Sequence, residues 1–137
     1  MGITYLQLSA SSELPEFSSP PFKAVVIAED SVSPKRRAEI SRWLVESGCL
    51  YVTVWGTESS AWNDAVNLIN LESFGFEKIP DDRLVITTCH ERESLSEAFW
   101  FSKYSAMHPC AELSDTVLLH LSAAEREQEI RDQYLNA

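Results

Sequence analysis

The sequence predicts an α/β fold, in which a mainly parallel four-stranded sheet lies between two layers of helices as a three-layer α/β/α sandwich. Four short apolar runs that contain β-branched residues alternate along the chain with four amphipathic helical patterns. Parallel strands need long crossover connections, which the alternating helices supply. At 137 residues with 45% apolar residues, the chain also has the size and composition of one domain.

The first predicted strand and helix follow a segment rich in Ser and Pro. Phe22 to Ala28, FKAVVIA, is a compact apolar run that suits a strand buried on both faces. Ser33 and Pro34 are favourable as the N-cap and the first residue of a helix, and Gly48 is a favourable end. We therefore expect a central strand followed by an amphipathic helix.

The second predicted unit repeats this pattern. Leu50 to Trp55, LYVTVW, predicts a strand, and either Ser59 or Ser60 can cap the helix that follows it. Apolar residues then recur with the i, i+3, i+4, i+7 spacing of a helix face, and Gly75 lies just past the end of that pattern.

The third predicted unit contains a polar cluster. Leu84 to Ile86 is an apolar run too short for a helix, which predicts a strand. Ser94 followed by Glu97 matches a capping box, in which each side chain satisfies a free amide at a helix start. Residues 87–93 would then connect the end of the strand to the start of the helix.

The fourth predicted unit ends the chain. Thr116 to Leu121 predicts a strand, and Ser122 with Glu125 repeats the capping-box pattern before a C-terminal helix. For these four strands we favour the order 2-1-3-4, in a Rossmann-like or flavodoxin-like sheet. This order places the first strand beside the third at a switch point.

The N-terminal residues are expected to lie at the margin of the domain. Ile3 to Leu8 alternates weakly, which is typical of a short extra edge strand, and Ser9 to Pro21 is rich in Ser and Pro, which predicts a loop. We therefore expect residues 1–137 to form a single α/β domain, with residues 1–21 as a peripheral N-terminal segment.

The chain is strongly acidic, with 21 Asp and Glu residues, 11 Lys and Arg residues and a formal net charge of −10. This charge opposes binding to nucleic-acid phosphates and to anionic lipid, so we expect neither nucleic acid nor a membrane as a partner. A basic protein or a cationic ligand fits better. The charge also has a simpler explanation, because acidic surfaces keep many proteins soluble.

The cysteines and the hydropathy pattern bear on the compartment. Cys49, Cys89 and Cys110 are odd in number and widely spaced, without a CxxC or a spacing typical of structural zinc, which indicates a reducing environment. No stretch reaches the roughly 20 apolar residues of a membrane span, and the N-terminus lacks a signal-peptide pattern. We therefore expect a cytoplasmic protein.

Parallel strands bring their carboxyl ends to one edge of a sheet, where ligands of such sheets bind. The residues that follow the predicted strands would form an acidic rim with an aromatic floor, suited to a partner that presents Lys or Arg. The alternative is that Trp55 is a buried core residue and that the carboxylates are solvated or cap helices. The candidate partner-binding residues are Glu29, Asp30, Trp55, Glu58, His90, Glu91 and Glu93.

Metal and nucleotide sites have weaker support in the sequence. Asp30, His90 and Glu91 are admissible metal ligands, but no HExxH or paired-His spacing occurs. No GxGxxG or GxxxxGK[ST] loop is present, and Asp30 as a phosphoacceptor lacks the expected Lys after the last strand. We therefore assign no metal and no cofactor.

Cys89 beside His90 suggests a nucleophile with its base. Adjacent residues on an extended segment point to opposite faces, however, so His108 or His120 would have to act as the base instead. A small buried thiol is the commoner role for such a cysteine. We therefore assign no catalytic residue.

The segment Thr87 to Phe101, TTCHERESLSEAFWF, resembles a small, uncharacterised bacterial domain family in which Thr-Thr-x-His is followed by an acidic turn and an L-x-E-A-x-W-F helix. This resemblance implies a compact bacterial α/β domain and supplies no settled catalytic residues. In its small size, its acidity and its lack of a catalytic motif, the chain is also similar in type to immunity proteins of interbacterial toxin systems. That similarity implies a cognate toxin as the partner, often a basic nuclease whose active site is blocked.

Three hypotheses about function follow from these patterns. The leading one is an acidic protein-binding module of the immunity-protein type, which neutralises a basic toxin domain by binding it. The alternative is a small enzyme or ligand-binding domain, with Asp30, Cys89 and His90 in a closed pocket at the strand ends. The third is a homodimer that forms through Trp100 and Phe101.

Overall fold

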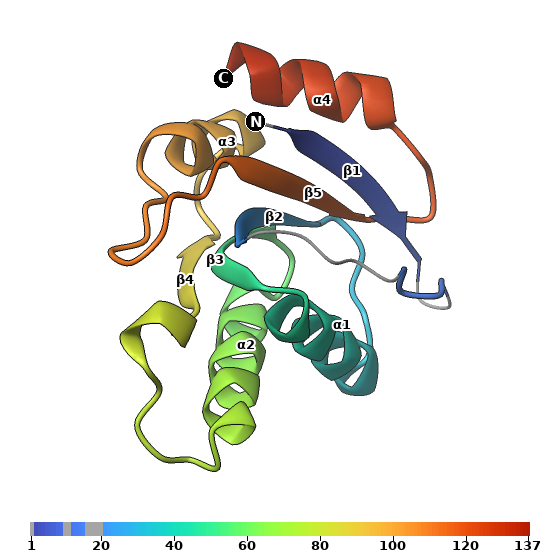
Figure 1. Cartoon of the computed structure of the whole chain (residues 1–137). Coiled ribbons are helices and arrows are strands. Elements are labelled where there is room, and N and C mark those ends of the chain that lie inside the picture. Colours follow the sequence, from blue (N-terminus) through green and yellow to red (C-terminus); the bar gives the residue numbers. More distant parts are fainter. Residues whose placement is uncertain (1, 10–11, 16–20) are drawn as a thin grey trace.

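A computed structural model describes residues 2–9, 12–15 and 21–137 of the chain. These residues form five strands, four helices and one short 3-10 turn, and strands alternate with helices from the second strand onward (Figure 1). The elements are β1 (Ile3–Leu8), β2 (Phe22–Ala28), α1 (Pro34–Glu46), β3 (Cys49–Gly56), α2 (Ser59–Ser73), the 3-10 turn (Asp81–Arg83), β4 (Ile86–His90), α3 (Leu95–Tyr104), β5 (Asp115–Leu121) and α4 (Glu127–Asn136).

All neighbouring strands in the sheet are parallel, in the order β1-β5-β2-β3-β4. The predicted α/β class is confirmed, and the sheet has five strands because Ile3–Leu8 joins it as an edge strand. The predicted order 2-1-3-4 is wrong, since β2 lies between β5 and β3, and β4 is an outer strand. Burial explains this order, because β5 is almost wholly buried and needs two neighbours, whereas β4 is mostly half-buried and suits an edge.

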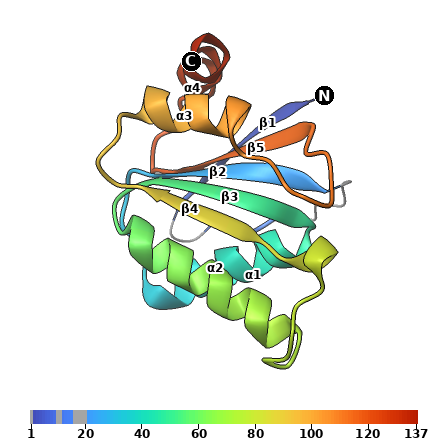
Figure 2. The same ribbon diagram turned by 90° about the vertical axis from the view of Figure 1, so that its left-hand side faces the viewer.

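Helices cover both faces of the sheet, with α1 and α2 on one face and α3 and α4 on the other (Figure 2). Because successive side chains of a strand point to opposite faces, Val26 joins the core cluster under α1 and α2, and Ile27 joins the cluster under α3 and α4. Trp62 of α2 and Phe99 of α3 are the largest buried side chains of the two helices. Each face of the sheet therefore has its own hydrophobic core.

Two of the predicted helix starts are confirmed. The Ser33 Oγ accepts a hydrogen bond from the Arg36 amide at 3.1 Å, and Pro34 is the first helical residue. At the start of α3, Ser94 and Glu97 form the predicted capping box. These caps satisfy amides that have no partner within the helix itself.

The other two predicted helix starts are wrong. Neither Ser59 nor Ser60 caps α2, because Glu58 occupies the N-cap position with a left-handed backbone at φ 59°. The C-terminal helix begins at Glu127 rather than after a capping box at Ser122. The Ser122 amide instead donates to the Leu8 carbonyl, which keeps this residue tied to the sheet.

The turn from β3 into α2 requires a glycine. Gly56 has φ 103°, a conformation that favours glycine, and a Cβ at this position would collide with the Ala28 carbonyl oxygen. The close approach lets the Thr57 amide donate to the Ala28 carbonyl at 2.8 Å. The carboxyl ends of β2 and β3 are therefore held tightly together.

β4, which is the third of the four strands predicted from the sequence, extends further than predicted. Its ladder with β3 runs from Ile86 to His90, so Thr87, Thr88, Cys89 and His90 belong to the strand rather than to a turn. Leu84, the predicted start of the strand, lies before it and is exposed. Main-chain pairing with β3 stabilises this polar segment in an extended form that its composition does not favour.

The remaining predictions concern the N-terminal loop and the membrane. Within the predicted loop from Ser9 to Pro21, Ser9 and residues 12–15 have no regular secondary structure, and residues 10–11 and 16–20 lie outside the described part of the chain. Among the helices that the structure describes, none is long and apolar enough to cross a membrane.

Replacing Phe99 by Ala should lower the free energy of unfolding by about 3 to 5 kcal/mol, because it leaves a cavity between α3 and the sheet. Trp100→Ala is the matched control on the same helix, since Trp100 is 53% exposed, and should cost about 1 kcal/mol or less. Urea unfolding followed by circular dichroism measures both. Equal losses would contradict the assignment of Phe99 to the core.

Candidate functional site

The carboxyl ends of the strands and the loops that follow them form one edge of the sheet, here called the carboxyl edge. The ladder register aligns five residues in a single row just inside it, on the face that α3 and α4 cover. The row reads Gln7, His120, Ile27, Trp55 and His90 across β1, β5, β2, β3 and β4. Two buried histidines therefore lie at separate places beneath the same edge.

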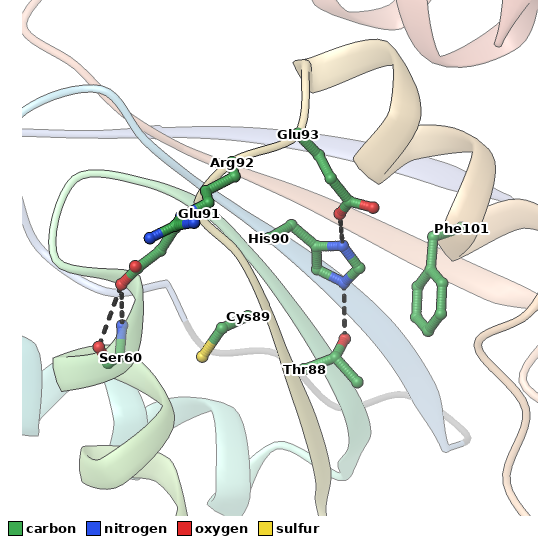
Figure 3. Close-up of a pocket in the computed structure, with 8 residues that line it drawn as sticks. All are labelled: Ser60, Thr88, Cys89, His90, Glu91, Arg92, Glu93 and Phe101. Atoms are coloured by element: carbon green, nitrogen blue, oxygen red, sulfur yellow. Dashed lines mark hydrogen bonds and ion pairs between the residues drawn. The ribbon is translucent and has the colours of Figure 1, made fainter.

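His90 is held by partners on both ring nitrogens (Figure 3). Its Nδ1 pairs with the Glu93 carboxylate, and its Nε2 shares a hydrogen bond with the Thr88 Oγ1 at 2.9 Å. The Phe101 ring lies against the imidazole, with 4.7 Å between the ring centroids, and His90 is only 6% exposed. His90 is thus fixed in place rather than free to act on a ligand.

His120, which is fully buried, is the centre of a second network. Its Nδ1 shares a hydrogen bond with the Tyr5 hydroxyl at 2.5 Å, and its Nε2 pairs with the Glu29 carboxylate. The Arg126 guanidinium pairs with the same carboxylate, and the Arg126 amide donates to the Tyr5 hydroxyl at 3.1 Å. This network joins β1, β2 and β5 to the start of α4.

Asp30 and Glu58, two other predicted rim carboxylates, also have partners within the chain. The Asp30 Oδ2 accepts a hydrogen bond from the Ala123 amide at 3.0 Å. The Glu58 carboxylate accepts from the Ser31 hydroxyl and lies 3.4 Å from the Arg37 guanidinium. These contacts fix the direction of the carboxylates.

The Glu91 side chain, which follows β4, forms hydrogen bonds with the first turn of α2. The Ser60 hydroxyl donates to the Glu91 carboxylate at 3.1 Å. Hydrogen bonds from the Ser60 hydroxyl and amide lower the pKa of Glu91 below its ordinary value, so the exposed carboxylate stays ionised at neutral pH.

Trp55 links two parts of the predicted site. Its side chain is half-buried in the cluster beneath α3 and α4, and its Nε1 donates to the Glu93 carbonyl at 2.8 Å. The structure therefore brings Trp55, His90, Glu91 and Glu93 together around the end of β4. Glu29 and Asp30 lie at the same edge but contact the β5 side of it, and Glu58 faces α1.

A pocket of about 640 Å³ lies at the end of β4 and opens widely to solvent. Residues 88–93 line it together with Ser60 and Phe101. Figure 3 shows that Cys89 and Ser60 lie on one side of the strand, and that Thr88, His90 and Phe101 lie on the other. The pocket therefore wraps around the outer side of β4 rather than entering the core.

Cys89 is not paired with a histidine base. Its thiol donates to the Ser59 carbonyl at 3.4 Å, on the opposite side of β4 from His90. Burial raises the pKa of the Cys89 thiol, and the carboxylates of Glu91 and Asp64 raise it further. A protonated thiol in such surroundings is a poor nucleophile.

The other two candidate bases are engaged elsewhere. His108 shares a hydrogen bond with the Leu84 carbonyl at 2.8 Å and accepts one from the Cys110 amide, while His120 is enclosed by its own network. No cluster of three or more His, Cys, Asp or Glu side chains suited to a metal ion occurs within the part of the chain that the structure describes.

Tyr5, Ser60 and Arg126 contribute contacts that the sequence did not predict. Each pairs with a residue far away in the chain, as when Arg126 contacts Glu29 across 97 positions. A histidine inside the apolar run Thr116 to Leu121 was the one local signal of a buried polar network, because a buried imidazole needs hydrogen-bond partners.

Comparison with known proteins assigns the chain to a family but not to an activity. One family, described as a domain of unknown function, matches residues 3–137. No curated protein and no solved structure matches the chain. What the site does must therefore follow from the geometry of its own residues.

Replacing Tyr5 by Phe should lower the free energy of unfolding by about 1 to 3 kcal/mol, because it leaves the buried His120 Nδ1 without its partner. Tyr104→Phe is the matched control, since Tyr104 is 53% exposed, and should change stability by about 0.5 kcal/mol or less. Thermal and urea unfolding measure both variants. Equal stability of the two variants would show that the Tyr5 hydroxyl is dispensable.

Replacing Ser60 by Ala should raise the pKa of Glu91, because it removes the hydroxyl that stabilises the ionised carboxylate. Ser60→Thr retains a hydroxyl and should leave the pKa near the wild-type value. Carboxyl ¹³C chemical shifts followed through a pH titration measure the three proteins. The same Glu91 pKa in all of them would contradict the role given to Ser60.

Proposed function

Because the chain belongs to the family DUF7684, a domain of unknown function, its role has to follow from its own residues, and we propose that it is an acidic protein-binding module. It binds a basic partner protein through the carboxyl edge. The observation that carries this proposal is the set of fixed carboxylates around the open pocket at the end of β4.

Hydrogen bonds hold these carboxylates in position without removing them from solvent. The side chains of Glu58 and Glu93 remain 39% and 40% exposed, although each has a partner within the chain. Glu91 is exposed and ionised. A carboxylate that is already oriented loses little conformational freedom when Lys or Arg approaches it, which favours binding to a basic surface.

The shape of the pocket favours a macromolecular partner over a small ligand. An enzyme or ligand-binding domain of this class is expected to enclose its ligand at the strand ends. The pocket beside His90 instead opens widely to solvent. His90, His120 and the Cys89 thiol also have partners that restrict their use in chemistry.

The partner class that we propose is a basic toxin domain, which the chain neutralises as an immunity protein does. The support is the combination of small size, a net charge of −10 and an acidic edge with fixed side chains. Charge complementarity of this kind accelerates encounter and weakens as salt rises. A gene for a basic toxin domain directly upstream of the gene for this chain would support the proposal.

Charge-neutralising substitutions at the carboxyl edge test the proposal. Glutamine keeps most of the hydrogen bonds while removing the charge, so the fold should persist. The immobilised protein is exposed to an extract of the cells that produce it, and the bound basic proteins are quantified at low and high salt. The edge variant carries Glu58→Gln, Glu91→Gln and Glu93→Gln and should lose about tenfold in capture.

A matched variant separates the edge from total charge. It carries three exposed carboxylates that lie away from the carboxyl edge, near the amino ends of the strands, and it changes the net charge by the same amount. These substitutions are Glu46→Gln, Glu77→Gln and Glu112→Gln, and they should leave capture unchanged. Equal capture by the two triple variants, or capture that does not fall with salt, would remove the proposal.

A further inference from the structure

β4 is an outer strand, so one of its two sides faces no other strand. A hydrogen bond just before it identifies the main-chain groups on that side. The Val85 amide donates to the Oδ1 of Asn70, a side chain of α2, at 2.9 Å. Main-chain groups of successive residues point to opposite sides of a strand, and those of every second residue point to the same side, so Thr87 and Cys89 point the same way as Val85.

The ladder between β2 and β3 gives the same direction. The Thr57 amide donates to the Ala28 carbonyl, so Thr57 and the alternate residues before it in β3 direct their main-chain groups toward β2. Val54 therefore directs its groups toward β4, where it lies opposite Cys89. In a parallel ladder, a residue whose amide and carbonyl bond to the neighbouring strand lies opposite a residue whose own amide and carbonyl point away from it, so the main-chain groups of Cys89 point away from β3.

Before β4, the outward-pointing main-chain groups of Arg83 and Val85 form hydrogen bonds to a side chain, and Val85 is the last residue to do so. Asn70 accepts from the Val85 amide and donates to the Arg83 carbonyl at 3.2 Å, as a neighbouring strand would. Among the described residues, no hydrogen bond outside the sheet ladder reaches a main-chain group of Ile86–His90. The outward groups of Thr87 and Cys89 are thus left open.

The opposite side of the sheet is protected in a way that β4 is not. On β1, the Gly2 carbonyl bonds to β5, so Ile3 points outward, and the Arg131 guanidinium donates to the Ile3 carbonyl at 2.7 Å. Proteins also block open strands with Pro, Lys or a bulge. The β4 sequence ITTCH contains neither residue, and its ladder has no register shift.

The open side of β4 lies in acidic surroundings. The carboxylates of Asp64 and Glu91 both act on the Cys89 thiol, and the Glu93 carboxylate lies on the other face of the strand beside His90. The pocket at this end of β4 is lined from both faces, so it continues the open side of the strand (Figure 3). Cationic side chains on either face of an added strand would meet a carboxylate.

We propose that the open side of β4 accepts an extended, basic segment of the partner protein as an additional strand. This inference rests on the proposed function and names the part of the partner that binds. Hydrogen bonds to the main chain of Thr87 and Cys89 provide affinity, and the neighbouring carboxylates select Lys or Arg. A second copy of the chain is a poorer occupant, because two chains of net charge −10 repel each other.

Synthetic peptides of about ten residues test this inference in isolation. One peptide alternates Lys with Val, a second alternates Glu with Val, and a third is a basic helix-forming peptide of the same charge as the first. The first should bind about tenfold more tightly than either of the others. In ¹H–¹⁵N spectra of the full chain, it should shift the Thr87 and Cys89 amides more than those of β1.

A pair of substitutions at one position separates the main chain from the side chain. Cys89→Pro removes the outward N–H, whereas Cys89→Ala removes only the thiol and keeps the N–H. The Lys-Val peptide should bind Cys89→Ala as it binds wild type and should bind Cys89→Pro about tenfold more weakly. Thr87→Pro with Thr87→Ala repeats the comparison, and circular dichroism verifies the fold of each variant.

Four results would overturn the inference. Two concern affinity: equal binding of the Lys-Val peptide to the Pro and Ala variants, and equal binding of the three peptides to the wild-type chain. The third is a set of amide shifts confined to regions away from β4. The fourth is a concentration-dependent dimer that the Pro variants abolish. The last result would identify a second copy of the chain as the occupant. None of these results decides the proposed function, since that depends on the separate Glu→Gln capture experiment.

Discussion

Parallel pairing of five strands is the constraint on which the other features of this protein depend. Because β1, β5, β2, β3 and β4 all run in the same direction, their following loops converge on one edge. The register then places His120 and His90 in one row beneath that edge. A buried imidazole is costly without hydrogen-bond partners, and the carboxylates of Glu29 and Glu93 provide them.

The acidic edge therefore combines stability with recognition. Glu29 and Glu93 each contact a buried histidine, so their positions are determined by the core rather than by solvent. Glu58 and Glu91 are instead oriented by side chains of neighbouring loops and helices. This distinction guides the choice of substitutions, because reversing the charge of Glu29 or Glu93 would disturb folding and binding together, whereas Glu58 and Glu91 report mainly on surface charge. Glu93 is therefore replaced by Gln, which keeps a hydrogen-bond acceptor for His90.

The position of β4 links this edge to the open side of the sheet. Its polar residues would be costly in a central strand but are tolerated at the margin, where one side meets solvent. The Asn70 side chain limits the length of this open side, because it forms hydrogen bonds with the Arg83 carbonyl and the Val85 amide just before β4. The pocket, the carboxylates and the open main-chain groups of β4 thus adjoin one another without any of them being part of the core.

The sequence by itself determined the α/β class, the bounds of β2, the helix starts at Ser33 and Ser94, and the acidic character of the chain. These features arise from composition or from contacts a few residues apart. Tertiary structure alone decided the order of the strands, the extension of β4 to His90, and the pairing of Glu29 with His120 across 91 positions. The physical reason is that a cap or a hydrophobic period acts locally, whereas a neighbour in the sheet is selected by the burial of whole strands.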